Sequence, residues 1–313
     1  MAATVTALVT PRHAVPPNAI PDALLKIWRE CCQEDAGNSV SRALITNLIA
    51  VVTAERERPM RATLEALATR LPCRAFLVVV SPGQGPITAE VHGAAREHGT
   101  IRDLVLEQIE LFVPEGAFTR LPGLVRPLLV HDIPTRLYWG APWPQDPRRF
   151  DALATMADLS ILDSSRFELP ATDLDAFETR RRRGMQLIDL EWMRLRPWRR
   201  ALAEVFERVR YQPSLHTTAV LRHGEGALSA SILLARWLEQ RLSAHVAIES
   251  TGSCNSLCGV EIQHGSAAAS VTLVDPGRIE VAVETEAACF LPFGVPASRG
   301  GEGDLLAAAI DLA

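Results

Sequence analysis

The chain has 313 residues, a length that fits two compact domains more readily than one. Apolar residues make up 48% of it and charged residues 22%, which is the balance of a folded globular protein and excludes an intrinsically disordered chain. The formal net charge of −5 argues against a general binder of nucleic-acid backbones.

The N-terminal stretch MAATVTALVTPRHAVPP lacks the pattern of a signal peptide, because its apolar run is weak and no basic segment precedes it. Residues 1–18 are instead predicted to form a flexible leader. The apolar runs elsewhere are much shorter than a membrane span. We therefore expect a cytoplasmic protein whose six cysteines are thiols rather than a disulfide framework.

The segments after the leader predict a parallel sheet. A helix is expected from Ile20, and the apolar run Ala43–Val52 is typical of a buried strand. Met60–Leu71 has the spacing of an amphipathic helix, and Cys73–Pro82 that of a second buried strand. This strand–helix–strand order predicts a βαβ unit.

The middle of the chain is predicted to continue the same domain. Residues 87–96 and 101–113 are expected to be strands, and polar residues such as Gln108 and Glu110 suggest that the second strand faces solvent on one side. Leu121–Pro144 is rich in prolines and contains one further predicted strand, TRLYWG. A helix, a strand and two more helices are then expected over residues 148–157, 158–165, 173–190 and 191–209.

The stretch YQPS, Tyr211–Ser214, is predicted to be a linker, after which the strand–helix–strand pattern restarts and ends in a β-meander and a last helix. The predicted fold class is α/β, with two α/β domains. The first has a mostly parallel sheet, and the second is a smaller α/β unit that ends in the meander. The predicted boundaries are a leader over 1–18, an N-terminal domain over 19–210 and a C-terminal domain over 211–313.

The patterns of the common catalytic and cofactor sites do not occur in the sequence. Ser81–Ile87 contains Gly-x-Gly, but a strand and not a helix follows it, so it does not make a dinucleotide fingerprint. Gly-x-Ser-x-Gly, HExxH and paired CxxC motifs do not occur, and the only lysine, Lys26, lies outside any glycine-rich loop. We expect no catalytic residue, no metal and no cofactor.

Two turns at strand ends are candidate anion sites, because backbone N–H groups at such ends can bind a phosphate. One is the polar end at Asp163, Ser164 and Ser165, and the other is the glycine turn at His223, Gly224 and Gly226. An ordinary βα turn explains the second pattern more simply.

Two cysteine pairs are candidates for a redox pair. Cys254 and Cys258 lie in CNSLC, and Cys31 and Cys32 are adjacent on the first predicted helix. The alternative is that these side chains pack as small apolar groups.

The run Arg180–Arg183 follows acidic residues. It is predicted to be a solvated helix face whose arginines pair with Asp173, Asp175 and Glu178. Binding to nucleic acid would need interleaved aromatic residues, which this run lacks. We expect neither a nucleic-acid nor a membrane partner.

Aromatic residues are the unusual feature of the sequence. Trp143 lies between prolines on a predicted loop, where burial is hard to arrange, whereas Trp237 lies on an amphipathic helix and is best explained by core packing. For Trp192 and Trp198, core packing and contact with a partner remain equally open, because periodicity does not separate the two.

Two segments have a spacing of aromatic and arginine residues that marks a known family. RPLLVHDIPTRLYWGAPWP, Arg126–Pro144, is similar to an apolar–Pro–Leu–Leu–x–Asp–x–Pro–x–x–x–Trp–Trp–Pro segment, with Tyr138 in place of the first tryptophan. DLEWMRLRPWRR, Asp189–Arg200, is similar to an Asp–Leu–x–Trp–x–Arg–Leu/Ile–x–x–Trp–Arg segment, and Met156–Phe167 to an Ala–Asp–x–x–Ile–x–Asp–Ser segment. The chain thereby resembles the OpcA family, the glucose-6-phosphate dehydrogenase assembly proteins.

The resemblance implies a non-catalytic accessory protein. It would bind glucose-6-phosphate dehydrogenase and favour the active oligomer of that enzyme. In this way it would support the supply of NADPH by the oxidative pentose phosphate pathway. Self-association is not predicted either way. The expected partner-binding residues are Tyr138, Trp139, Trp143, Asp189, Trp192, Arg194, Trp198 and Arg199.

A second hypothesis is a sugar-phosphate-binding enzyme or metabolite sensor of central carbon metabolism. Its anchors would be the two candidate anion sites, since ligands of open α/β sheets bind at the carboxyl ends of strands.

Overall fold

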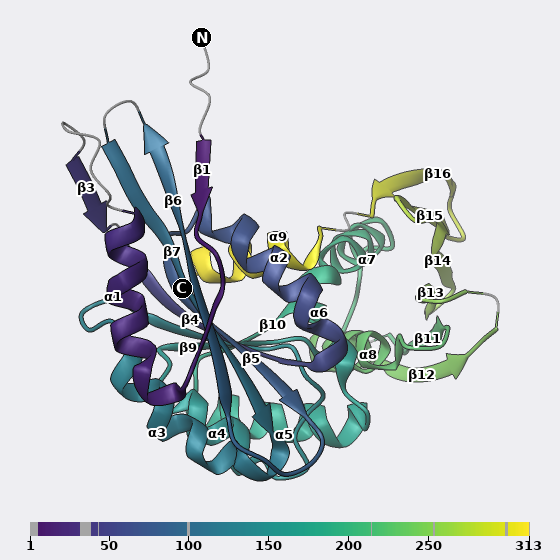
Figure 1. The fold of residues 1–313 in the computed structure, drawn as a ribbon. Helices are drawn as coiled ribbons and strands as arrows, with labels where there is room; N and C mark the ends of the chain where they lie inside the picture. Colours follow the sequence, from purple (N-terminus) through teal and green to yellow (C-terminus); the bar gives the residue numbers. More distant parts are fainter. Residues whose placement is uncertain are drawn as a thin grey trace. The chain divides into compact units, whose positions relative to one another are not determined.

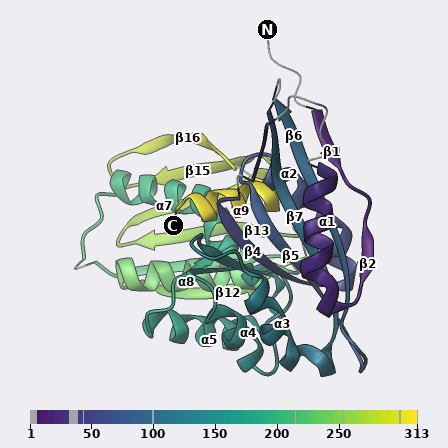
Figure 2. The ribbon, with the colours of Figure 1, turned by 60° about the vertical axis from the view of Figure 1, so that its left-hand side comes forward.

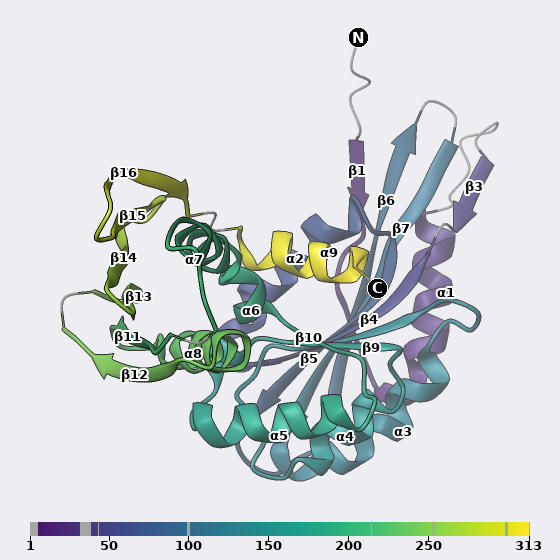
Figure 3. The ribbon, with the colours of Figure 1, turned by 180° about the vertical axis from the view of Figure 1, so that it is seen from behind.

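The computed structural model describes residues 6–31, 39–42, 44–98, 101–213, 215–252, 254–297 and 300–312. By its internal contacts the chain divides into two compact units. Unit 1 contains Met1–Leu162, Gly184–Ile188 and Glu302–Ala313, and unit 2 contains Asp163–Arg183 and Asp189–Gly301. Each unit has one sheet, and the two sheets are seen from three directions in Figures 1–3.

Unit 1 is built on a sheet whose order among the described residues is β1-β6-β7-β5-β4-β8-β9-β10, with β2 also paired to β6 and β3 to β7. Its strands are β1 (Thr6–Val9), β2 (His13–Val15), β3 (Ser39–Arg42), β4 (Thr46–Thr53), β5 (Cys73–Ser81), β6 (Thr88–His98), β7 (Ile101–Pro114), β8 (Thr135–Trp139), β9 (Leu159–Leu162) and β10 (Leu187–Asp189).

The centre of this sheet is parallel, as the sequence predicts. Strands β4 and β5 pair in parallel from Thr46 opposite Cys73, and the helix between them is α2 (Glu57–Ala68). Strand β8 continues the parallel order beside β4, and β9 beside β8. Nearly every residue of β4 and β5 is buried, which explains their unbroken apolar sequence.

The other helices of unit 1 are α1 (Ile20–Cys31), α3 (Leu121–Val125), α4 (Arg148–Ala154) and α9 (Glu302–Asp311). Helix α1 packs on β6 and β7, whereas α2 packs on β4 and β5 and also contacts α9 (Figure 1). The last helix of the chain therefore belongs to the first unit.

Two expectations for unit 1 differ from the structure. Where a flexible leader is predicted, β1 and β2 pair antiparallel with β6, and β2 lies beside α1 (Figure 2). Strand β7 has no solvent-facing side at Gln108 and Glu110, both fully buried. Arg61 donates two hydrogen bonds to Glu110, and Arg74 binds Glu107, so these polar side chains are buried with partners.

Unit 2 is built on a sheet of order β12-β11-β13-β14-β15-β16. Only β11 and β12 pair in parallel, and the remaining described pairs are antiparallel, which gives the predicted meander. The strands are β11 (Thr217–His223), β12 (His245–Ser250), β13 (Leu257–His264), β14 (Ala267–Asp275), β15 (Arg278–Glu284) and β16 (Cys289–Pro296).

The helices of unit 2 are α5 (Pro170–Arg182), α6 (Leu190–Arg194), α7 (Arg196–Arg208) and α8 (Leu228–Leu242). Helices α7 and α8 lie side by side on one face of the sheet (Figure 3). Burial alternates along β11, and the buried residues Ala219 and Leu221 share one core with Trp198 and Leu202. Because α7 packs on β14, β15 and β16, the boundary predicted at residues 210 and 211 lies inside unit 2.

Candidate functional site

The aromatic residues of the first family segment form a cluster at the end of β8. Trp139 is buried, its indole N–H donates to the Pro142 carbonyl oxygen at 3.0 Å, and its ring lies 5.6 Å from that of Phe150. Trp143 is half-buried, with its ring centroid 5.0 Å from Phe150. Of these residues Trp143 retains the exposed ring surface that contact with a partner requires.

Tyr138 lies at the switch point of the parallel sheet. Strand β4 has β5 on one side and β8 on the other, and in folds of this kind ligands bind outside the carboxyl ends of the two diverging strands. Here the fully buried Tyr138 donates its hydroxyl hydrogen bond to Glu302, and Arg56 forms an ion pair with the same carboxylate. The first residue of α9 therefore occupies the switch point.

The turn after β4 also lacks the chemistry of a phosphate site. Residues 53–57 read Thr-Ala-Glu-Arg-Glu, without a glycine, and Glu57 begins α2. The carboxylate of Glu57 adds negative charge at this helix N-terminus, which disfavours a phosphate there. This geometry agrees with the absence of a dinucleotide fingerprint from the sequence.

The second family segment is joined to the polar end of β9 by buried ionic contacts. Arg194 donates to both oxygens of Asp163, at 2.6 and 2.8 Å, and a third bond of 2.8 Å goes to Glu191. Asp189 caps the N-terminus of α6 by accepting from the Glu191 N–H at 3.0 Å. Asp189 also accepts from the Ser164 backbone N–H at 3.1 Å and from its hydroxyl at 2.6 Å.

The two carboxylates of this joint have opposite pKa shifts. Burial raises the pKa of Asp189 to about 7, although hydrogen bonds from Ser164 and Glu191 oppose the change. Burial alone would also raise the pKa of Asp163, but the hydrogen bonds and charge of Arg194 bring it below its ordinary value. Every oxygen of both side chains accepts from a protein donor, so the arrangement serves to hold the segments together.

The candidate anion site at Asp163, Ser164 and Ser165 lies in this joint. Ser165 donates its hydroxyl hydrogen bond to Asp163 at 2.6 Å, and Ser229 of α8 donates to the Ser164 carbonyl oxygen at 2.6 Å. Two carboxylates beside these hydroxyl groups repel an anion. Anion binding at this turn stays a prediction that its electrostatics do not favour.

Trp192 and Arg199 form a stacked pair in unit 2. The Arg199 guanidinium lies 3.9 Å from the Trp192 ring centroid and donates to the Trp192 carbonyl oxygen at 3.2 Å. Both side chains are half-buried, whereas Trp198 is 7% exposed and packs in the core. Burial lowers the pKa of Arg199, and the charge of Arg196 adds to this effect.

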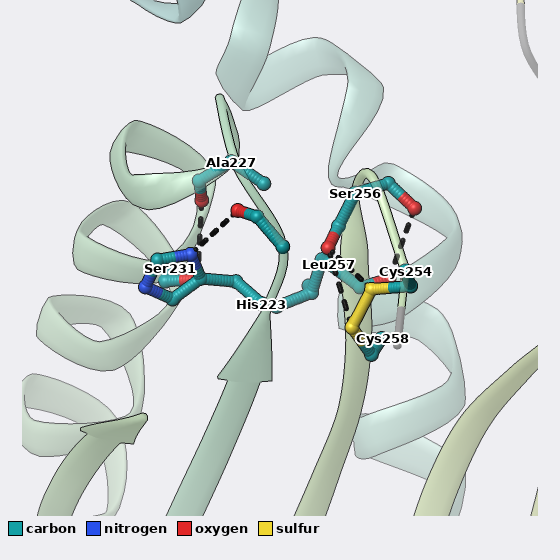
Figure 4. The surroundings of a disulfide bond; sticks show 8 residues. His223, Ala227, Ser231, Cys254, Ser256, Leu257 and Cys258 are labelled. Carbon is teal, nitrogen blue, oxygen red and sulfur yellow. Dashed lines mark hydrogen bonds between the residues drawn. A yellow bond between two sulfur atoms is a disulfide. The ribbon is translucent and has the colours of Figure 1, made fainter. Parts of the chain in front are cut away.

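The second candidate anion site is the turn between β11 and α8. The His223 imidazole nitrogen Nδ1 lies 2.8 Å from the Gly224 carbonyl oxygen, in the turn that precedes α8 (Figure 4). Gly224 donates its N–H to the Ser256 carbonyl oxygen, and the Cys254 carbonyl oxygen lies against its Cα, where a side chain would not fit. Gly226 has the positive φ of 81° expected for a glycine turn.

Cys254 and Cys258 form a disulfide beside this turn, with their Cα atoms 6.1 Å apart (Figure 4). The expectation that all six cysteines are thiols is therefore wrong for this pair, because the CNSLC turn brings the two side chains together. Whether the pair acts as a redox switch stays a prediction. Cys32 and the side chain of Cys31 lie outside the described residues.

One surface feature was not predicted from the sequence. An open groove of about 550 Å³ lies within unit 2, and Trp237, Arg210 and Arg241 contribute to its lining. Trp237, expected in the core, packs against the core with part of its ring and faces this groove with the rest. Trp237 lies at the edge of the buried face of α8, and this position in the helical period could have indicated that its ring is partly exposed.

The described residues contain no cluster of three or more metal-ligating side chains. Within the same part of the chain, no helix is long and apolar enough to cross a membrane.

Comparison with known proteins assigns the chain to a family. The family described as glucose-6-phosphate dehydrogenase subunit, N-terminal domain, matches residues 64–179, and its C-terminal counterpart matches residues 185–311. The chain belongs to the OpcA family. The resemblance of the two aromatic segments is thereby confirmed.

Relatives in cyanobacteria carry the same family name. An OxPP cycle protein OpcA of Nostoc punctiforme is 26% identical over 189 residues, which cover 57% of this chain and 39% of that protein. The OpcA protein of Synechocystis is 32% identical over 101 residues, 32% of this chain and 21% of that protein. The chain spans well under half the length of the curated relatives it matches.

Among solved structures, a 3-ketoreductase from Actinomadura kijaniata, determined with NADP and TDP-benzene, has a similar fold. The two chains are 11% identical with a TM-score of 0.50, over 86% of this chain and 88% of the other. At this identity the likeness concerns the fold alone, and it agrees with the predicted α/β class.

Proposed function

We propose that this protein is a non-catalytic accessory protein of glucose-6-phosphate dehydrogenase that binds the enzyme and promotes its active oligomer. The observation that carries the proposal is the match of both parts of the chain to domains described as those of a glucose-6-phosphate dehydrogenase subunit. The proposed context is the oxidative pentose phosphate pathway, because the relatives in Nostoc punctiforme and Synechocystis are named OxPP cycle proteins. Such a protein acts by binding the active assembly more tightly than the inactive one.

The switch point supports an accessory role over an oxidoreductase activity. Glu302, held by Tyr138 and Arg56, stands where a dinucleotide phosphate would bind in a doubly wound fold, and the turn after β4 has no glycine. A carboxylate in this position repels a pyrophosphate group.

Trp143, Trp192, Arg194 and Arg199 are the half-buried members of the expected partner-binding set, and Arg194 is already committed to Asp163 and Glu191. Tyr138, Trp139, Asp189 and Trp198 are buried within their own units. Tryptophan and arginine dominate the binding energy of protein interfaces. We therefore assign contact with the dehydrogenase to Trp143, Trp192 and Arg199, and a supporting role to the buried members.

The test is the affinity of purified variants for purified glucose-6-phosphate dehydrogenase from the same organism. Trp143→Ala and Arg199→Ala are expected each to weaken binding by about tenfold, which is the effect of losing roughly 1.4 kcal/mol at an interface. Arg200→Ala is the matched control, because Arg200 neighbours Arg199 on α7 and is 75% exposed. Wild-type affinity in both test variants would remove these residues from the contact surface.

A further inference from the structure

The groove in unit 2 lies between the C-terminal ends of α7 and α8. Phe206, Tyr211, Trp237 and Leu242 form its apolar lining. Its volume of about 550 Å³ is that of a ligand site, but it is open to solvent, and an open groove buries a chain segment better than it encloses a small molecule.

Contacts between the two helix ends hold the groove in shape. Tyr211 donates its hydroxyl hydrogen bond to the Leu242 carbonyl oxygen at 2.8 Å, and its ring lies edge-on to Phe206 at 5.8 Å. The Tyr211 backbone N–H donates to the Phe206 carbonyl oxygen and closes the end of α7. A partner would therefore meet a surface that is already formed, which lowers the entropy lost on binding.

Two exposed arginines stand at the rim, Arg210 and Arg241. Among the described residues neither has a carboxylate within 4.0 Å, whereas Arg200 pairs with Glu204 and Arg236 with Asp175. Glu207 also lines the groove, so the two arginines leave the rim with a net positive charge. On a chain of net charge −5, this is a local basic site beside aromatic rings.

The backbone of Arg210 has a conformation that glycine adopts more easily than arginine. Its φ is +50°, at the position after a helix end where glycine is the usual residue. Glycine there would relieve the conformation but would remove a guanidinium from the rim. Backbone strain of this kind gathers at binding sites.

We infer that this groove receives a segment of the partner protein in which an apolar or aromatic side chain lies between carboxylates. The apolar side chain packs against Trp237 and Tyr211, and the carboxylates bind Arg210 and Arg241, whose planar guanidinium groups match them in two-bond geometry. This step rests on the proposed function, under which the partner that provides the segment is glucose-6-phosphate dehydrogenase.

The experiment measures the affinity of the full-length protein for the purified dehydrogenase, with charge-reversed variants. Arg210→Glu combined with Arg241→Glu is expected to weaken binding at least tenfold, because the variant places like charges opposite the partner carboxylates. The control combines Arg182→Glu with Arg200→Glu, which changes the net charge equally at two sites that are each 75% exposed. The control is expected to bind as wild type.

Arg210→Gly separates a binding role from a folding role. Because glycine suits the positive φ, this variant is expected to melt at a temperature equal to or above that of wild type, and to bind the dehydrogenase several-fold more weakly. Trp237→Ala is expected to weaken binding further than Arg210→Gly.

Each result has one meaning. If the wild-type protein does not bind the dehydrogenase, the proposed function fails and this inference falls with it. If the wild type binds and the groove variants bind equally well, the groove inference alone is overturned. It is also overturned if the groove variants change self-association in sedimentation velocity while dehydrogenase affinity stays the same, since the occupant would then be a second copy.

Discussion

Arg194 is the residue on which the second family segment depends. Asp163 is fully buried, and Arg194 supplies it with two charge-assisted hydrogen bonds. Sequence comparison alone makes Arg194 look like a recognition residue, because arginine is common in interfaces. Its position shows that it holds the tryptophan-arginine segment to Asp163, which lies in another segment similar to the family, Met156–Phe167.

Removing Arg194 is expected to destabilise unit 2 strongly. Arg194→Ala removes both short hydrogen bonds from the buried Asp163 carboxylate and leaves the longer ion pair with Arg166, at 3.5 Å, so the free energy of unfolding is expected to fall by about 3 kcal/mol. Arg182→Ala, which breaks an exposed pair with Glu178, should lower it by less than about 1 kcal/mol. Urea unfolding followed by tryptophan fluorescence measures both. Equal effects of the two changes would show that the Asp163 pair is not a buried structural contact.

Asp189 predicts a pH dependence of stability. Its pKa rises from 3.8 to about 7 on folding, so the folded state holds a proton more tightly than the unfolded state. The contribution to stability is therefore complete below about pH 4 and is lost as the pH rises toward 7. Asp189→Asn removes this titration, and the wild-type-minus-variant difference in unfolding free energy should fall between pH 4 and pH 7.

The quantity to measure is the difference in unfolding free energy between wild type and Asp189→Asn, because His92 changes stability with pH in the opposite direction. Burial lowers the pKa of His92 to about 4, so its contribution to stability grows between pH 4 and 6.5. His92 lies in unit 1 and is present in both proteins, so its effect cancels in the difference. A difference that does not change with pH would contradict a raised pKa at Asp189.

At the scale of elements, α9 is the least expected part of unit 1. It comes last in the chain, and its first residue is bound by Tyr138 and Arg56 at the ends of strands that come much earlier. Long-range docking of this kind leaves little signal in local sequence patterns. The helix itself was predictable from its apolar spacing, but the elements on which it packs were not.

Tyr138→Phe is expected to loosen α9 without unfolding the sheet. The change removes the hydrogen bond from the Tyr138 hydroxyl to Glu302, and a hydrogen bond to a charged group contributes about 1.5 kcal/mol or more. Amide hydrogens of α9 should then exchange at least about tenfold faster, while those of α8 in unit 2 keep their wild-type rates. Unchanged exchange in α9 would mean that the hydroxyl does not hold the helix.

The elements of the parallel sheet were predictable because each is buried on both faces or amphipathic over its length. Strands β4 and β5 and helix α2 illustrate this, since their apolar residues follow the period of the structure they form. Strand β7 illustrates the limit. Its Gln108 and Glu110 look solvent-facing until the arginine partner from α2 is known.

Candidate sites were harder to predict than elements, because several of their contacts join residues that are distant in the sequence. The Trp192–Arg199 stack and the Asp189 cap follow from residues close in sequence, and both segments were singled out. The groove of Trp237, Arg210 and Arg241 lies between the ends of α7 and α8, which are separated in the chain by strand β11, so no local pattern marks it.

For the molecule as a whole, the likeness to solved structures shows the fold alone. A doubly wound sheet is shared with nucleotide-dependent oxidoreductases, yet the switch point here contains Glu302 and no glycine-rich turn. Function resides in sites rather than in folds. The proposed function therefore rests on the family assignment and not on the likeness of the sheet.

The central claim is that this protein binds glucose-6-phosphate dehydrogenase and promotes its active oligomer. The direct measurement is light scattering after size-exclusion chromatography of the dehydrogenase from the same organism, alone and with increasing amounts of this protein, with activity measured on every peak. We predict a shared peak in which the enzyme has a larger oligomeric state and higher specific activity than alone. Separate peaks, with the oligomeric state and activity of the enzyme unchanged at every ratio, would contradict the account.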